Sequence, residues 1–200
     1  MSNSLARSGT GRLFDRHLGC DTVRVLPGDY YVTDEAIGII TVLGSCVAAC
    51  LWDARSGFGG MNHFMLPDGG DGDASNGAPA RYGLFAMEVL INDLLKSGAR
   101  RSHMQAKVFG GGRVIRGMTT INVGDRNADF VLEFLRTEKI PVVGHDLREP
   151  FARKVAFMPA SGRAMVKRID PHADASIVEQ ERSYVSTLAS KPVAGDIELF

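Results

Sequence analysis

The feature that most constrains the fold is an apolar run, residues 37–43, that stops at Gly44 and Ser45 and is followed at once by Cys46. β-Branched and aliphatic residues over this length predict a buried strand, and Gly-Ser is typical of a turn or cap. If residues 47–51 continue as a helix, Ser45 is its N-cap and Cys46 lies at the positive end of the helix dipole. Such a position favours a thiolate, so Cys46 is a candidate nucleophile.

A histidine follows in a segment that can fold back toward this cysteine. His63 lies within GGMNHFMLP, where glycines permit a tight return and apolar residues anchor the strand. A neutral imidazole within hydrogen-bond reach of Cys46 would accept the thiol proton and then stabilise the thiolate. Thr41 is predicted to orient the imidazole or to hydrogen-bond a substrate amide. Backbone N–H groups at Ser45 and Val47 are predicted to receive a developing oxyanion.

Each of these residues also has an alternative interpretation. A free cysteine is among the most buried residue types, and a threonine in a strand is ordinary packing. A metal site would use Cys46, Cys50 and His63, although the C-x3-C-x12-H spacing is unusual for zinc. Its fourth ligand would come from one of three other histidines: His103, His145 and His172. Thiol chemistry by itself also does not separate deamidation from proteolysis or transamidation.

Longer stretches around these residues resemble a known family. LGSCVAACLWD followed by GGMNHFMLPD is similar to the signature of the chemoreceptor glutamine deamidases, the CheD family of bacterial chemotaxis proteins. The resemblance continues in the same order into KVFGGG, residues 107–112, and INVGDRN, residues 121–127, and covers roughly residues 25–169. One segment, GHDLREPFARKV, departs from the family's Gly-Gly pattern and carries His145 and Pro150. The departure concerns the shape of this loop and not the Cys-His pair.

The resemblance implies an activity and a fold. In that family the cysteine is the nucleophile, the histidine its base and a threonine a supporting group, which here are Cys46, His63 and Thr41. The implied substrates are glutamines on the cytoplasmic coiled coil of methyl-accepting chemotaxis proteins, with no metal or cofactor. The implied fold is a single-domain layered α/β/α sandwich with mixed β-sheets, similar to cytotoxic necrotizing factor catalytic domains. A non-catalytic alternative stays open, in which the chain regulates a CheC-like phosphatase or the receptor array.

Composition limits the classes of partner. Lys plus Arg and Asp plus Glu both number 23, so no net charge favours nucleic acid or an anionic membrane. Three cysteines give no disulfide framework and the N-terminal residues have no apolar signal core, which predicts a cytoplasmic location. The longest apolar stretch, residues 36–52, is short for a membrane span and is interrupted by glycine, so no membrane insertion is expected.

The chain length and the alternation of apolar patterns indicate one α/β domain with two extensions. Residues 1–24 are predicted to be a loosely ordered arm, residues 25–172 the deamidase domain, and residues 173–200 a partly helical C-terminal extension. Residues 68–80 are rich in Gly, Asp and Ser and are predicted to form a surface loop.

Periodicity and turn residues predict the remaining elements. The clearest amphipathic helix covers residues 82–96, and Asn127 is a fitting N-cap for a second helix over residues 128–138. Glycines 110–112 lack the spacing of a phosphate loop and are predicted to let the backbone approach a neighbouring strand or the substrate. Further elements are expected as follows: two strands within residues 23–43 with Tyr30 and Tyr31 in the turn between them, strands at 105–109 and 140–143, a hairpin of 154–158 with 163–169, and helical spacing at 174–188.

Overall fold

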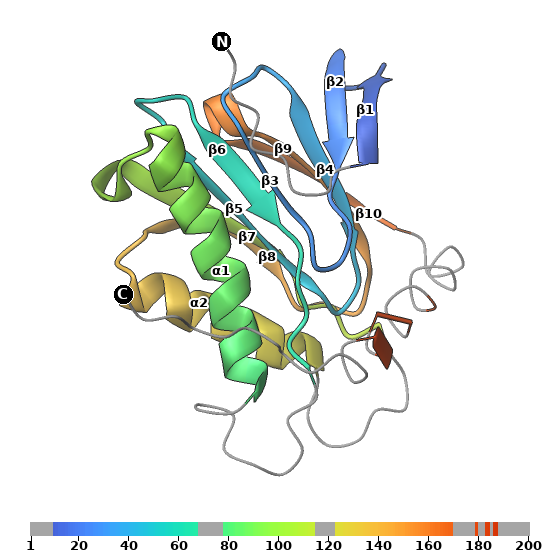
Figure 1. Ribbon diagram of the computed structural model, residues 1–200. Coiled ribbons are helices and arrows are strands. Elements are labelled where there is room, and N and C mark those ends of the chain that lie inside the picture. The colour runs from blue at the N-terminus through green and yellow to red at the C-terminus, as the bar shows by residue number, and fades with distance from the viewer. Residues whose placement is uncertain are drawn as a thin grey trace.

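The computed structural model describes residues 10–67, 78–114 and 123–169, together with Glu179, Ser183, Tyr184, Ser186 and Thr187. Within these residues, two five-stranded sheets and two long helices are packed in layers (Figure 1). None of the helices in these ranges is both long enough and apolar enough to cross a membrane.

One sheet, which we call the outer sheet, has the strand order β1-β2-β4-β9-β10. Its β2–β4 pair is parallel and its other pairs are antiparallel, so the sheet is mixed. Its strands are β1 (Thr10–Asp15), β2 (Cys20–Arg24), β4 (Gly38–Leu43), β9 (Arg153–Met158) and β10 (Arg163–Arg168).

The second sheet, which we call the central sheet, has the order β3-β6-β5-β7-β8. Only its β7–β8 pair is parallel, so this sheet is mixed as well. Its strands are β3 (Tyr30–Thr33), β6 (Gly59–Asn62), β5 (Val47–Asp53), β7 (Met104–Gly110) and β8 (Val142–Leu147).

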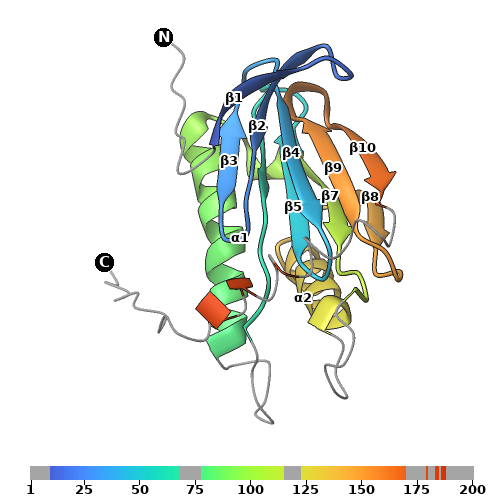
Figure 2. The ribbon, with the colours of Figure 1, turned by 90° about the vertical axis from the view of Figure 1, so that its right-hand side faces the viewer.

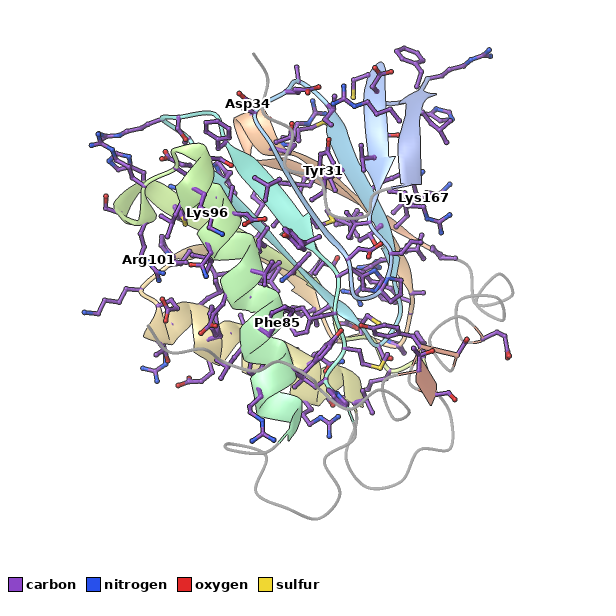
Figure 3. All side chains as sticks on the ribbon, viewed as in Figure 1. Tyr31, Asp34, Phe85, Lys96, Arg101 and Lys167 are labelled. Atoms are coloured by element: carbon purple, nitrogen blue, oxygen red, sulfur yellow. The ribbon has the colours of Figure 1, made fainter. Side chains whose placement is uncertain are left out.

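The helices α1 (Ala78–Ser97) and α2 (Val123–Thr137) cover one face of the central sheet, and the outer sheet covers its other face (Figures 1 and 2). Two 3-10 turns, η1 (Arg101–His103) and η2 (Pro159–Ser161), precede β7 and β10. Every residue of β5 is buried, because alternate side chains enter the helix-side core and the core between the sheets. The outward face of α1 carries the exposed Phe85 and Lys96 (Figure 3).

The prediction of one α/β domain with mixed sheets is confirmed, but the order of its layers differs from the expected α/β/α. Among the described residues the order is helices, central sheet, outer sheet. The reason lies in the inner face of the outer sheet, where Ile39, Val155 and Phe157 are buried directly against the central sheet. Two apolar sheet faces in contact leave no room for a helical layer between them.

Three local predictions are corrected by the structure. Residues 47–51 form strand β5 and not a helix, because a short continuous apolar run fits a strand buried on both faces as well as a helix. Tyr30 and Tyr31, expected in a turn, belong to β3. Residues 10–24, expected in a loose arm, contribute β1 and β2 to the outer sheet, although Leu13 and Phe14 stay largely exposed.

The later elements agree more closely with the sequence. The hairpin of β9 and β10 is confirmed, with Gly162 left-handed in its turn. Helix α1 begins four residues earlier than predicted, and α2 begins at Val123, so Asn127 lies inside α2 and is not its N-cap. Of the predicted loop over residues 68–80, residues 68–77 lie outside the described part of the chain. The described members of the C-terminal segment are helical, as its spacing predicts.

Candidate active site

The turn that carries Cys46 is where the chain passes from the outer sheet to the central sheet. Gly44, Ser45 and Cys46 connect the end of β4 to the start of β5. The backbone N–H of Gly112 donates to the carbonyl of Gly44 at 2.7 Å, and that of Gly111 donates to the carbonyl of Cys46 at 2.7 Å. The glycine segment after β7 therefore holds the turn at both ends, which is the backbone approach that the sequence predicts.

Glycine is required at the first position of this segment. Gly110 has φ +106°, a left-handed conformation that favours glycine. A Cβ at this position would lie 2.2 Å from the carbonyl oxygen of Cys46, which is inside van der Waals contact. Any other residue would therefore push the nucleophile turn out of place.

Asn127 holds the middle of the same turn from α2. Its side-chain Nδ2 donates to the carbonyl of Ser45 at 2.9 Å, and its Oδ1 accepts from the backbone N–H of Leu66 at 2.9 Å. Asn127 is fully buried. A single side chain thus ties the cysteine turn to the segment that follows His63, and sequence reasoning assigned this residue only to a helix cap.

His63 is placed beside Cys46 by the pairing of their strands. Val47 and Phe64 form an antiparallel bridge, so His63 lies opposite Ala48 and diagonal to Cys46. Diagonal neighbours on one face of an antiparallel pair are about 7 Å apart at their Cα atoms, within reach of long side chains. Cys46 and Ala48 both face the core between the sheets, so His63 and Cys46 share that space.

Thr41 reaches the histidine from the opposite sheet. Its Oγ1 donates to the carbonyl of Val25 at 2.8 Å and lies 2.8 Å from Nδ1 of His63. Because the hydroxyl proton is used on Val25, the Thr41 oxygen accepts from a protonated Nδ1. The neutral imidazole then has its lone pair on Nε2, which leaves that nitrogen to act as the base. The structure thus brings Thr41 and His63 together as the sequence predicts.

The site is closed to solvent. Cys46 is 0% exposed, Thr41 1% and His63 2%. Cys50 is equally buried on the same face of β5, and loss of solvation there raises the pKa of its thiol far above the ordinary value, which the charge of Lys107 only partly offsets. The two cysteines therefore share burial, but Cys50 lies inside the ladder of β5 whereas Cys46 lies in the turn that precedes it.

The predicted set of oxyanion donors is corrected in one place. The backbone N–H of Val47 donates to the carbonyl of Phe64 at 2.9 Å, because Val47 is the first residue of β5 and belongs to its ladder. In a trans peptide the C=O and N–H groups point in opposite directions. The Ser45 carbonyl points to Asn127, so the N–H of Cys46 points away from α2. The Gly44 carbonyl accepts from the N–H of Gly112, so by the same argument the N–H of Ser45 points away from Gly112.

The loop that departs from the family pattern lies next to the supporting glycines and not at the Cys-His pair. The carbonyl of Glu149 accepts from the backbone N–H of Arg113, and Arg148 and Glu149 both have left-handed φ angles. Arg153 is fully buried beneath this loop and donates to Asp146 and to the carbonyl of Arg148. A buried cation with these acceptors holds the loop in a defined shape.

Within the described residues, no three His, Cys, Asp or Glu side chains come together as a metal site, and Cys46, Cys50 and His63 are no exception. His103 lies far along the central sheet from this site, next to the buried carboxylate of Asp53 at 3.7 Å. His145 is in β8, and His172 lies outside the described residues.

Fold and site together define an α/β protein with a buried Cys-His-Thr arrangement between two mixed sheets. Comparison with known families gives a more specific class of protein. Residues 65–168 match the family model described as CheD chemotactic sensory transduction.

Three relatives named probable chemoreceptor glutamine deamidase CheD are similar over nearly the whole chain. Proteins from Thiobacillus denitrificans and Methylobacillus flagellatus are 55% and 51% identical over 193 residues, 96% of this chain and 95% of each relative. A protein from Dechloromonas aromatica is 54% identical over 191 residues, 96% of this chain and 94% of that protein. The chain belongs to the CheD family.

Among solved structures, the chain is similar to the Bacillus licheniformis hypothetical protein YfiH, with 14% identity, a TM-score of 0.37 and coverage of 61% of this chain and 49% of that one. A TM-score this low does not define a shared fold. The expected likeness to cytotoxic necrotizing factor catalytic domains stays a prediction.

Proposed function

We propose that this protein is a chemoreceptor glutamine deamidase that converts glutamine side chains of methyl-accepting chemotaxis proteins to glutamate. Membership of the CheD family supports the proposal, as do relatives of about 50% identity whose printed name states this activity. The observation that carries the chemistry is the hydrogen bond from His63 to Thr41 beside Cys46, which leaves Nε2 as the base. The proposed catalytic residues are Cys46, His63 and Thr41.

In the proposed first step, Nε2 of His63 takes the thiol proton and the sulfur of Cys46 attacks the carboxamide carbon of the glutamine. The carbonyl π electrons move to oxygen, and the N–H groups of Ser45 and Cys46 are the proposed donors to this oxyanion. The imidazolium then gives its proton to the nitrogen, the C–N bond breaks and ammonia leaves. The product of this step is a thioester on Cys46.

In the proposed second step, the neutral imidazole takes a proton from water as the water oxygen attacks the thioester carbon. The C–S bond then breaks, the sulfur recovers the proton from the imidazolium, and the substrate leaves as glutamate. Nδ1 of His63 keeps its proton in both steps, so its hydrogen bond to Thr41 persists while Nε2 gains and loses charge. Thr41 is thus proposed to hold one tautomer and one ring orientation throughout.

The proposed partner is the cytoplasmic coiled coil of the receptors, and the proposed location is the cytoplasm, with no membrane insertion and no nucleic-acid binding. A CheC-type phosphatase is a second proposed partner. The alternative function, a non-catalytic regulator of that phosphatase or of the receptor array, requires none of the geometry around His63.

The deciding experiment is to incubate the protein with a receptor cytoplasmic fragment and to follow Gln-to-Glu conversion by peptide mass spectrometry. We expect conversion at specific glutamines with stoichiometric ammonia and without chain cleavage. Cys46→Ser is the inactive comparison, and Cys20→Ala, on the outer sheet away from the site, is the matched control that keeps activity. Absence of conversion by the parent protein would support the non-catalytic alternative, whereas conversion by Cys46→Ser at the parent rate would refute Cys46 as the nucleophile.

A further inference from the structure

The closure of the site has a consequence for how a substrate enters. Cys46 and His63 are buried, yet a carboxamide on another protein has to bring its carbon to roughly 3 Å from the Cys46 sulfur. A covering group must therefore move before reaction. β4, β5, β6 and α2 surround the site as parts of the two cores, and moving any of them would break sheet ladders or helix packing.

Tyr184 is the described side chain that covers this region without belonging to either sheet or to α1 or α2. Its ring packs against the core between the sheets, the one that contains Cys46. A Cβ added to Gly28 would lie 2.9 Å from the Tyr184 hydroxyl oxygen, so the ring edge rests on a residue that has no side chain. The N–H of Gly28 donates to the carbonyl of His63 at 2.7 Å, which places Tyr184 directly beside the histidine's backbone.

A second contact joins Tyr184 to the helical layer. Its hydroxyl shares a hydrogen bond with the hydroxyl of Tyr82 on α1. Burial raises the pKa of both phenols, so both hydroxyls stay neutral. Ser183, next to Tyr184 in the chain, is exposed.

We propose that Tyr184 closes the entrance to Cys46, and that the substrate side chain enters between Gly28 and Tyr82 when Tyr184 withdraws. Among the described contacts, its withdrawal breaks the hydrogen bond to Tyr82 and the packing of its ring on the core, and it leaves both sheets and both helices intact. The identity of the entering group as a glutamine rests on the proposed function, whereas the closure does not. Access to the thiol is therefore set by an equilibrium between a closed and an open position of one aromatic side chain.

The test is the rate of Cys46 alkylation by iodoacetamide, measured by peptide mass spectrometry on the full chain with Cys50 as the internal reference. Tyr184→Ala is expected to raise the Cys46 rate more than tenfold and to leave Cys50 unchanged. Tyr184→Phe and Tyr82→Phe remove the same hydrogen bond from its two ends. Each is expected to raise the Cys46 rate about fivefold, the factor that one hydrogen bond typically corresponds to.

The outcomes separate closure from other roles of Tyr184. An unchanged Cys46 rate in Tyr184→Ala, in a protein with the parent's thermal unfolding, overturns the proposal. A parallel rise at Cys50 overturns it too, because that result indicates general loosening. A fall in deamidation with unchanged labelling would make Tyr184 a substrate contact and not a closure. Faster labelling of Cys46 without any deamidation of receptor fragments would support closure and count against the proposed function alone.

Discussion

Cys46 and Cys50 lie four residues apart, face the same core and are both completely buried, yet their surroundings differ in kind. Cys50 lies inside β5, paired with Met61 on one side and Lys107 on the other, and burial keeps it a thiol. His63, opposite Ala48, is diagonal to both cysteines, but Cys46 precedes the strand in a turn whose carbonyls accept hydrogen bonds from Gly111, Gly112 and Asn127. Burial alone thus makes an inert thiol. The proposed nucleophile differs because it lies in the turn at the end of β5 and not inside the strand.

The largest expected effect comes from replacing each of the two cysteines in turn by alanine. Cys46→Ala should lower ammonia release by at least about 10³-fold, since the nucleophile cannot be replaced by its neighbours. Cys50→Ala should keep the rate within about twofold and instead lower the unfolding free energy by about 1 kcal/mol, through a small cavity. Ammonia release and thermal unfolding, measured on both variants, check the pair. Substantial activity in Cys46→Ala would refute the nucleophile assignment.

His63 gives the next largest expected effect. His63→Gln keeps a hydrogen-bonding side chain of similar length but removes the base, so turnover should fall about 10²- to 10⁴-fold. Binding of the receptor fragment should change little, because the imidazole acts on the thiol and not on the substrate's remote parts. Single-turnover rates and fragment affinity, measured in parallel, test this split. A variant that loses binding and keeps its rate constant would assign His63 to recognition.

Substitutions of Asn127 test whether activity requires the hydrogen bond that positions the Cys46 turn, in addition to the cysteine itself. Asn127→Ala leaves the Ser45 carbonyl without its side-chain donor, and the misplaced Cys46 N–H should cost about 10²-fold in kcat with a smaller change in KM. Asn127→Asp keeps the acceptor for Leu66 but donates to Ser45 only when the carboxyl is protonated.

Burial raises the pKa of an introduced carboxyl, so the protonated form gains population as the pH falls. The ratio of Asn127→Asp activity to parent activity should therefore increase toward low pH. A constant ratio would mean that Asn127 acts only through stability, which thermal unfolding of the same variants measures independently.

The sequence predicted the candidate catalytic side chains better than the strand and the side chain that hold them in place. Cys46, His63 and Thr41 stand near the breaks of apolar runs, where local patterns are informative, and the structure joins Thr41 to His63. The strand after Cys46 was predicted as a helix because seven residues buried on both faces show no period of two. Asn127 acts on Ser45, 82 residues away, and no local pattern carries a contact of that range.

Substitutions of Thr41 have the smallest expected effect. They distinguish a role in orienting the His63 ring from a role in packing. Thr41→Val keeps the shape but removes both the acceptor for Nδ1 of His63 and the donor to the carbonyl of Val25. Turnover should fall about tenfold because the tautomer and ring orientation are no longer fixed, and stability should fall by about 1 to 3 kcal/mol because two buried polar groups lose their partner. Thr41→Ser restores the oxygen and should recover most of the rate while remaining slightly less stable through its lost methyl group. Ammonia release compared with thermal unfolding decides the role: if Thr41→Val matches the parent in ammonia release, the hydroxyl does not orient His63.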